Sequence, residues 1–452
     1  MFEGLKSAAR LLHPGLGFKR WFIPLVTGLI ITGFGIGLFL SELITGIRTT
    51  LLLQPLFQKS WAAWIPGVTM ALMGLGLTGY SLYRLNKLLL QAILPNKQAT
   101  VGYVAEQVYR HHRRKRRGPK VVALGGGTGL SVLLRGLKHH TENITAIVTV
   151  ADDGGSSGKL RRELGVLPPG DFRNCIAALA DDEALTTQLF QYRFRSGGLE
   201  GHSFGNLFIT AMAAVTGSFE KALYESGRVL NIGGEIFPST LQNVTLFAEV
   251  DEGPQTRKVK GESAIPEANL PIERVYLEPS SAHAFPPAIQ AILNADLIVA
   301  GPGSLYTSII PNLLIGEIVT AIRASSAPKI YICNVATQPG ESDDYDLADH
   351  VQAIESHTDI IDIQQEDQRE QNFFTAQRTK KTLFGYVLAN NNQTRPIPEN
   401  MSHLKYVPFT NFESSGYQVI GADVIDEQYP WRHDATKLGN AVINWYKNLS
   451  HQ

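Results

Sequence analysis

One stretch of the chain allows few backbone arrangements because of its glycines: VVALGGGTGLSVLLRGLK, residues 121–138. The apolar residues Val121 to Leu124 predict a short buried strand, and apolar residues recur at helical spacing from Leu130 onward. The five positions between them are Gly125, Gly126, Gly127, Thr128 and Gly129. A strand, a glycine loop and a helix present free backbone N–H groups and a positive helix end to an anion, usually phosphate.

This loop matches neither of two common phosphate-binding motifs. The dinucleotide fingerprint requires a glycine three residues after Gly127, where this chain has Leu130, and the P-loop ends in Gly-Lys-Ser/Thr. A tight turn between strand and helix, without a ligand, is the alternative. The density of glycines favours a phosphate site over that turn, but it does not identify the ligand.

Two uncharged apolar runs precede the glycine loop. Residues 21–40 and 61–83 are each long enough to cross a bilayer. Both are rich in glycine, which lets membrane helices approach closely, and both have aromatic residues near their ends. A signal peptide is the alternative for the first run, but no cleavage site is evident before the second. Residues 1–90 are therefore predicted to form a two-helix transmembrane hairpin with spans of about 21–40 and 61–83.

The basic residues around these runs predict an orientation. Lys6, Arg10, Lys19 and Arg20 precede the first run, Arg84, Lys87 and the basic run 110–117 follow the second, and the loop between them has only Arg48 and Lys59. The positive-inside rule then predicts a two-pass protein of the plasma (inner) membrane, with both termini and the main domain in the cytoplasm. Residues 91–118 are predicted to be a basic juxtamembrane linker, which either contacts anionic lipid headgroups or is simply solvated. A nucleic-acid partner is not expected.

From residue 119 to residue 452, apolar strand-like segments alternate with helical ones. Strands are predicted at 121–124, 144–150, 297–300 and 329–334, and helices at 131–140, 204–215 and 436–449. This alternation predicts an α/β domain with a doubly wound, mainly parallel sheet and helices on both faces. An antiparallel excursion is expected within 241–272, and the polar segment 152–165 is predicted to be a loop. The two cysteines, Cys175 and Cys333, are far apart and are expected to be reduced thiols.

Several polar segments follow predicted strands, where a doubly wound sheet binds its ligands. The carboxylates Asp152 and Asp153 could hold Mg²⁺ beside substrate phosphates or act as a base. A plain Asp-Gly turn is the alternative, and we favour a functional role. The segment 301–308, GPGSLYTS, is a second glycine loop whose donors suit another phosphate or a sugar. Two such loops at one edge of the sheet suit a diphosphate, and hence a nucleotide or nucleotide-sugar.

Two further motifs stand at predicted helix starts. In GDFRN, Asp171 is favoured as a helix N-cap, whereas Arg173 and Asn174 could equally contact phosphate or sugar. In GHSFGN, no second ligand at metal spacing accompanies His202. Ser203 and Asn206 are better suited to phosphate or ribose contacts.

The motifs resemble, in order, those of the gluconeogenesis factor family, which is related to 2-phospho-L-lactate transferase. They are GGGTGLSVLLRGLK (125–138), VTVADDGGSSGKLR (148–161), LPPGDFRNCIAALA (167–180), GHSFGNL (201–207), GPGSLYTSIIPNLL (301–314), CNVATQPGES (333–342) and RHD (432–434). The resemblance covers residues from about 119 to 446. The hairpin resembles that of longer, membrane-anchored members from photosynthetic bacteria.

The resemblance implies a Rossmann-like fold that binds nucleotide-sugars such as UDP-glucose or UDP-N-acetylglucosamine. It implies a regulator of cell shape and of growth on gluconeogenic carbon sources, which forms a homo-oligomer and acts through a protein of envelope synthesis. The related transferase uses Mg²⁺ to move a phospholactyl group from a guanylated donor to a deazaflavin. Its acceptor-loop motifs are not evident here, which argues against deazaflavin as acceptor.

The resemblance also implies roles for individual residues. The loop from Gly125 to Gly129 would face the diphosphate, Arg432 would close over the ligand, and Asp152 and Asp153 would place metal and acceptor. The residues that would line the nucleotide are Asn206, Gly301, Gly303, Ser304, Tyr306 and Thr307.

Three functions remain open from the sequence. The favoured one is a membrane-tethered nucleotide-sugar sensor, and the second is a Mg²⁺-dependent transferase that uses Asp152 and Asp153. A nicotinamide-dependent dehydrogenase is weaker, because the glycine loop lacks the fingerprint spacing.

Overall fold

A computed structural model of the chain describes residues 19–52, 65–93, 118–180, 184–367, 382–409 and 416–449. Most of the predicted linker 91–118, including the basic run 110–117, lies outside the described residues, and so do residues 61–64 of the second apolar run. Contacts within the chain divide it into two units, Met1–His111 and His112–Gln452.

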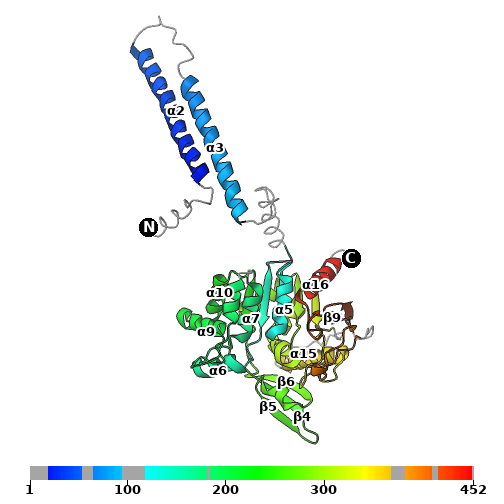
Figure 1. Ribbon diagram of the computed structural model, residues 1–452. Coiled ribbons are helices and arrows are strands. Elements are labelled where there is room, and N and C mark those ends of the chain that lie inside the picture. Colours follow the sequence, from blue (N-terminus) through cyan, green and yellow to red (C-terminus); the bar gives the residue numbers. More distant parts are fainter. Residues whose placement is uncertain are drawn as a thin grey trace. The chain divides into compact units, whose positions relative to one another are not determined.

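The first unit contains two apolar helices, α2 (Lys19–Leu52) and α3 (Ile65–Ile93). Within the described residues, Ile23–Ser41 and Ile65–Leu85 are long and apolar enough to cross a membrane, as the sequence predicted. Figure 1 shows the two helices side by side. Large apolar side chains of both point outward, among them Phe34 (62% exposed) and Met73 (74% exposed). An apolar surface of this kind is suited to contact with lipid chains and not with water.

Glycines allow the two helices to touch along their backbones. A Cβ atom at Gly35 would lie 2.4 Å from the backbone nitrogen of Ala71, and one at Gly74 would lie 2.5 Å from that of Thr32. Larger residues at these positions would separate the helices. The glycines of the apolar runs thus allow the close approach of the two helices that the sequence predicted.

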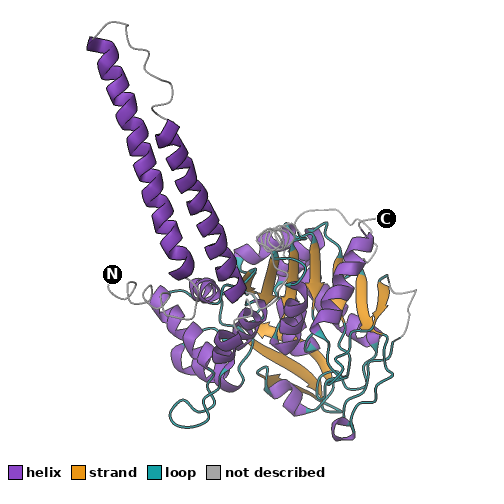
Figure 2. Ribbon diagram, turned by 45° about the horizontal axis from the view of Figure 1, so that its top comes forward, coloured by secondary structure: helices purple, strands orange, loops and turns teal. Residues whose placement is uncertain are grey.

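The second unit contains a parallel sheet of the doubly wound type. Its order is β10-β9-β8-β7-β1-β2-β3, and every neighbouring pair is parallel. The strands are β1 (Val121–Gly125), β2 (Ile144–Val148), β3 (Glu235–Pro238), β7 (Leu297–Ala300), β8 (Lys329–Ile332), β9 (Tyr386–Asn390) and β10 (Gln418–Ala422). The predicted α/β class and parallel sheet are confirmed. Figure 2 shows these strands aligned between helices.

The helices lie in two packed groups. Because successive strands run outward from β1 in one direction and from β7 in the other, right-handed crossovers place helices on opposite faces. The first group, joined by contacts of α5 and α7, comprises α5 (Gly127–Leu137), α7 (Gly170–Leu179), α8 (Ala184–Gln191), α9 (Phe204–Thr216), α10 (Phe219–Val229) and α16 (Ala435–Leu449). The second comprises α12 (Pro286–Leu293), α13 (Ile310–Leu313), α14 (Gly316–Ala324) and α15 (Leu347–Asp367).

The predicted antiparallel excursion is confirmed as a separate small sheet. It has the order β5-β4-β6 and consists of β4 (Thr245–Asp251), β5 (Thr256–Lys260) and β6 (Ile272–Glu278). A short helix, α11 (Ala264–Ala268), follows β5, and a 3₁₀ turn spans Glu399–Met401.

The prediction of a loop over 152–165 is wrong. Gly155–Leu164 form a helix, α6, although the segment has few apolar residues. Tertiary contacts supply what the local sequence lacks, because the Arg161 guanidinium donates to the backbone carbonyls of Ala151 (3.4 Å) and Asp152 (3.2 Å) and to the side chain of Asn243 (2.9 Å). The helix is therefore held by its own arginine to the segment that follows β2.

Candidate functional site

The order of the strands reverses between β1 and β7, and both glycine loops lie at this point. The two strands are neighbours, and the Gly301 N–H donates to the Leu124 carbonyl (2.9 Å). Gly126 follows β1, and Gly301 follows β7. A crevice outside the carboxyl ends of the strands forms at such a reversal. The two loops predicted to bind phosphate are thereby brought together.

The first loop is shorter than predicted, because β1 already includes Gly125 and α5 begins at Gly127, not near Ser131. Gly127 has φ +61°, a conformation that favours glycine. Gly129 approaches the second loop so closely that a Cβ atom there would lie 2.3 Å from the Pro302 carbonyl oxygen. The contact between the loops therefore depends on a glycine.

The second loop is held by polar side chains that follow β8. The Asn334 side chain accepts from the Gly303 N–H (3.2 Å) and donates to its carbonyl (2.9 Å). The Gln338 amide donates to the hydroxyl of Ser304 (2.7 Å) and to a carboxylate oxygen of Glu341 (2.9 Å). These contacts fix the loop before any ligand binds.

A π-helix, Leu305–Ile309, follows this loop and draws two predicted ligand residues into the protein interior. Thr307 is buried and donates its hydroxyl to Glu341 (2.8 Å). Tyr306 is buried and its hydroxyl pairs with that of Tyr345 (2.8 Å). Both residues support the loop from behind, so the structure gives them an internal role in place of a position along the cavity.

Around the loops lies a cavity of about 710 Å³, a size that suits a small-molecule ligand. Its lining is Gly126, Gly127, Thr128, Gly129, Ser131, Val132, Arg135, Arg173, Asn174, Gln191, Arg193, Pro302, Gly303, Ser304, Ser308, Asn334, Val335, Ala336, Thr337, Gln338, Pro339, Leu404, Trp431, Arg432 and His433. Among these described residues there is no aspartate or glutamate, whereas four are arginines. The cavity is therefore strongly cationic.

The arginines come from both sides of α5. Arg173 is on α7, which packs against α5, and Arg193 follows α8. Arg135 is on α5 beside Gly136, where a Cβ atom would lie 2.0 Å from the carbonyl oxygen of Ala435 at the start of α16. Arg432 immediately precedes α16 in the chain. One pair of arginines thus lies toward α7 and the other toward α16.

Arg173 is the most constrained of the four. Its guanidinium donates to the hydroxyl of Ser203 (2.7 Å) and to the Asn174 side chain (2.8 Å), while its buried Nε has no hydrogen-bond partner within the described structure. Burial lowers the pKa of Arg173, and the nearby positive charge of Arg193 lowers it further. An anion bound in the cavity would offset both the burial of the Arg173 charge and its repulsion by Arg193, and would therefore raise the pKa of Arg173.

The GHSFGN motif supports the site without lining the cavity. Ser203 is buried, caps α9 by accepting from the Asn206 N–H (3.3 Å), and also accepts from Arg173. The buried Asn206 donates to the hydroxyl of Ser156 (3.1 Å), which also pairs with Nδ1 of His202 (3.0 Å). In the structure, the contacts of this motif orient Arg173 and the start of α6, and its predicted phosphate or ribose contacts remain predictions.

The prediction that Asp171 caps a helix is wrong. The helix α7 starts at Gly170, its N-cap position is Pro169, and no side chain caps it. The Asp171 carboxylate instead accepts a hydrogen bond from the Gly127 N–H. Burial, followed by repulsion from Asp152, raises the pKa of Asp171 to about 6. Asp171 thus braces the first glycine loop without lining the cavity.

Asp171 belongs to a carboxylate cluster behind the glycine loop. Its members, which interact electrostatically, are Asp152, Asp153, Asp171, Glu262 and Glu341. Asp152 accepts from the Gly154 N–H (2.9 Å), and Asp153 accepts from the Ser263 N–H (3.0 Å). Burial, with repulsion from the other members, raises the pKa of Glu262 to about 8. Glu262 had no signal in the sequence, because it follows a strand of the small sheet.

The raised pKa values predict how stability depends on pH. Burial raises the pKa of Glu341 to about 7, and those of Asp171 and Glu262 are about 6 and about 8. Because the unfolded chain loses these protons at lower pH than the folded chain, the contribution of these three carboxyl groups to stability is greatest below about pH 4, falls as pH rises, and is lost above about pH 8. Buried histidines such as His433, whose pKa is lowered from 6.5 to about 4 by burial, act in the opposite direction below pH 6.5. We expect Tm in detergent to fall by about 3–5 °C between pH 7 and pH 9, where Glu262 loses its proton and the histidines no longer titrate.

The variant Glu262→Gln, which cannot ionise, should reduce this fall. A Tm that rises from pH 7 to pH 9 in the unaltered protein, or a fall of equal size in the variant, would contradict the raised pKa of Glu262.

Whether the carboxylate cluster suits a metal ion depends on its donors. No three His, Cys, Asp or Glu side chains in the described ranges converge closely enough to hold a metal by themselves. Mg²⁺ often uses only one or two carboxylates together with substrate phosphates. Asp152 and Asp171 fit that chemistry because they repel each other and both have raised pKa values, whereas Asp153 is held by Ser263.

The structure thus separates the predicted site residues into three groups. Those along the cavity are Gly126, Gly127, Thr128, Gly129, Arg173, Asn174, Gly303, Ser304 and Arg432. Those behind it are Gly125, Asp152, Asp153, Asp171, Gly301, Tyr306 and Thr307, and those in the supporting motif are His202, Ser203 and Asn206. As ligand contacts, all of these remain predictions. Arg135, Gln191 and Arg193 were not predicted as site residues, because they stand in otherwise ordinary helical or loop segments.

Comparisons with known proteins show what this chain is similar to. Residues 121–428 match the sequence family described as 2-phospho-L-lactate transferase CofD. The gluconeogenesis factor of Bacillus subtilis is 55% identical over 53% of this chain and 75% of its own length. A gluconeogenesis-factor relative from Nostoc sp. is 42% identical over 97% of this chain and 93% of its own, which includes the apolar hairpin. A crystal structure of a UPF0052 family member from Bacillus halodurans covers 72% of this chain and 99% of its own, with 41% identity and a TM-score of 0.64.

Proposed function

This chain belongs to the family of 2-phospho-L-lactate transferase CofD and of the gluconeogenesis factors, and we propose that it is a membrane-tethered, nucleotide-sugar-binding regulator. The ligand class proposed is UDP-glucose or UDP-N-acetylglucosamine. The proposed role is the control of envelope synthesis, and so of cell shape, during growth on gluconeogenic carbon sources.

The observation that carries this proposal is the cationic cavity at the strand reversal. Two glycine loops and the N-terminus of α5 supply backbone N–H donors, and four arginines surround them. Guanidinium groups bind phosphate oxygens through paired hydrogen bonds. Trp431 and Leu404, at the edge of the cavity, offer apolar surface for a base. A diphosphate flanked by a base and a sugar suits this arrangement of charge.

The hairpin supports the proposed location. Two helices of sufficient length and apolar character support a membrane anchor, and the distribution of basic residues supports cytoplasmic ends. A regulator held at the inner face of the membrane would be close to the enzymes of envelope synthesis. We therefore propose a protein partner from that machinery, together with a homo-oligomeric state.

The proposal can be tested by identifying the natural ligand. The full chain is purified from its own membranes without added nucleotide, then denatured, and the released small molecules are examined by mass spectrometry. The expected result is a uridine diphosphate sugar at a substantial fraction of one per chain. Release of a dinucleotide cofactor in its place would contradict the proposal.

A second function, a Mg²⁺-dependent transferase, is favoured by the carboxylate cluster. The Asp171 carboxylate touches the same loop that lines the cavity. When bound there, Mg²⁺ would neutralise charge on the diphosphate and stabilise a leaving group. Asp152 and Asp171 would hold the ion, while Arg173 would orient the donor. Asp152 is also the candidate base for an acceptor hydroxyl, because burial raises its pKa.

The variant Asp152→Asn separates the two functions. Since Asp152 lies outside the cavity, we expect its replacement to change UDP-glucose affinity, measured without Mg²⁺, by less than about threefold. If the chain is a transferase, turnover of the activated donor should fall by at least about 100-fold in the same variant. Failure of every tested acceptor to support turnover in the unaltered protein would exclude the transferase.

A further inference from the structure

The small antiparallel sheet has two edge strands, and the structure covers one of them. On β6, the Val275 N–H donates to Nε2 of the buried His357 on α15 (2.9 Å). The opposite edge is β5, the outer strand in the order β5-β4-β6, and nearly all of its residues are exposed. In Figure 1 the small sheet lies at the lower end of the second unit. An exposed edge strand is a template on which another strand can form.

Alternate residues of β5 leave their backbone groups unpaired. Antiparallel strands exchange hydrogen bonds at every second residue pair. The Gly261 N–H donates to the Leu246 carbonyl (2.8 Å), so the register of the strands makes the odd-numbered residues of β5 face β4. Within the described structure, the backbone groups that point to the free edge, without a backbone partner, are those of Thr256, Lys258 and Lys260.

The lysines of β5 do not protect this edge. Native proteins often place lysine side chains at an edge strand to prevent another strand from pairing with it. Here Nζ of Lys258 lies 4.1 Å from the centre of the Phe247 ring on β4 and 2.7 Å from Glu278 on β6. Nζ of Lys260 lies 5.9 Å from the centre of the same ring. Because both side chains reach back over the face of the sheet, the backbone edge is left open.

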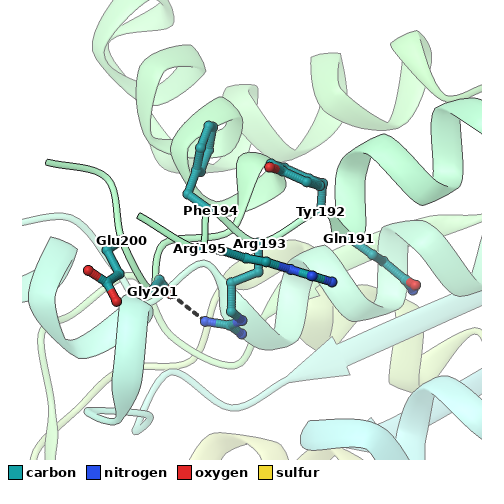
Figure 3. Close-up of a pocket in the computed structure, with 7 residues that line it drawn as sticks. All are labelled: Gln191, Tyr192, Arg193, Phe194, Arg195, Glu200 and Gly201. Atoms are coloured by element: carbon teal, nitrogen blue, oxygen red, sulfur yellow. Dashed lines mark hydrogen bonds between the residues drawn. The ribbon is translucent and has the colours of Figure 1, made fainter. Parts of the chain in front are cut away.

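The exposed turn between α8 and α9 has no comparable edge. Figure 3 shows the Arg193 side chain directed at the Gly201 carbonyl, to which it donates a hydrogen bond. The Gly201 N–H donates to the Phe194 carbonyl (3.0 Å), and the Phe194 N–H donates to the His202 carbonyl (2.9 Å). The turn thus uses its backbone groups internally, and its exposed side chains need no partner.

The charge of β5 determines which kind of strand suits its edge. The sequence of β5, TRKVK, includes Arg257, Lys258 and Lys260 and no acidic residue. A second copy of β5, paired about a two-fold axis at the centre of the strand, would place Lys258 opposite its own copy, and like charges across strands are destabilising. Arg257 and Lys258 are paired with Glu252 (3.3 Å) and Glu278, but exposed ion pairs of this kind are weak. Carboxylates of an added strand can therefore compete for these cations.

We propose that the β5 edge binds an extended acidic segment of a protein partner, which adds a fourth strand to the small sheet. The backbone of the segment bonds to Thr256, Lys258 and Lys260, and acidic side chains at alternate positions lie beside the two lysines. The main-chain bonds supply affinity, and the charge selects the segment. This inference rests on the proposed function for the existence of a protein partner, but not on the nucleotide-sugar cavity.

The test uses a short, end-blocked synthetic peptide of alternating threonine and glutamate, and the same peptide with lysine in place of glutamate as its control. With the full chain in detergent, fluorescence anisotropy should show saturable binding of the acidic peptide and at least about tenfold weaker binding of the basic one. Hydrogen exchange should show that the acidic peptide protects the Lys258 and Lys260 amides. The Val259 amide, which faces β4, should not change.

Two variants separate the backbone of the edge from its charge. Lys258→Pro removes an outward N–H, while Arg257 and Val259 keep their bonds to β4, so the small sheet should still form. The matched control, Lys258→Ala, loses the same side chain but keeps the N–H. We expect Lys258→Pro to bind the acidic peptide at least about tenfold more weakly than Lys258→Ala. Both variants should bind UDP-glucose as the unaltered chain does.

The outcomes distinguish this surface from the cavity. Absence of peptide binding, equal binding of the two peptides, or equal binding by the two variants would overturn the inference. Protection of amides around the cationic cavity, in place of those of β5, would also overturn it. If Lys258→Pro does not fold, the exchange measurement on the unaltered chain decides. Failure of UDP-glucose to bind, with the peptide still bound at β5, would remove the proposed ligand and leave this surface standing.

Discussion

Replacing Gly129 with alanine is expected to abolish ligand binding and to destabilise the second unit. The new Cβ atom would lie 2.3 Å from the carbonyl oxygen of Pro302 and 2.8 Å from Cα of Gly303. Since both are backbone atoms, the two loops must move apart. We expect a loss of about 1–3 kcal/mol in the free energy of unfolding and a loss of at least about 100-fold in UDP-glucose affinity.

The matched control is Gly385→Ala. A Cβ atom at Gly385 meets no atom within 4 Å, so this change should alter neither property. Chemical denaturation measures stability, and calorimetric titration measures binding. If Gly129→Ala binds UDP-glucose with unaltered affinity, the close contact between the two loops is not needed for the binding site.

Replacing Arg173 with glutamine is expected to weaken UDP-glucose binding by about 10- to 100-fold with little change in Tm. The guanidinium is held by Ser203 and Asn174 at the wall of the cavity, and its Nε has no partner in the described structure. An ionic hydrogen bond to phosphate is the contact that the variant would lose.

Two comparisons distinguish this effect from a general loss of charge. Arg228→Gln, which removes an exposed arginine of α10, should bind UDP-glucose normally. Ser203→Ala should produce a smaller loss than Arg173→Gln, because it releases the guanidinium without removing it. An affinity in Arg173→Gln equal to that of the unaltered protein would exclude Arg173 from the binding site.

The features that could be predicted from the sequence have local causes. Apolar length predicts the membrane helices, and the alternation of strands and helices predicts the parallel sheet. The glycine loop after Val121–Leu124 can be predicted because few backbone arrangements suit consecutive glycines. The location of the site can be predicted because a doubly wound sheet binds its ligands where the order of the strands reverses. Each of these inferences uses residues that are neighbours in the chain.

The features that were missed depend on contacts between distant segments. Helix α6 has a polar, glycine-containing sequence, and Arg161 holds it to the segment that follows β2. The carboxylate cluster includes Glu262, which the fold brings close to Asp152 and Asp171 from the end of the small sheet. Asp171 looked like a helix cap by its position, but its partner, Gly127, lies on another element.

Binding of a UDP-sugar by the full chain, without consumption of the sugar, is the central claim of this account. Calorimetric titration with UDP-glucose, followed by chromatographic analysis of the mixture after prolonged incubation with Mg²⁺, tests it most directly. The account predicts saturable binding of one sugar per chain, abolished in Gly129→Ala, with the sugar recovered intact. Absence of binding, or steady conversion of the sugar to another product, would contradict it.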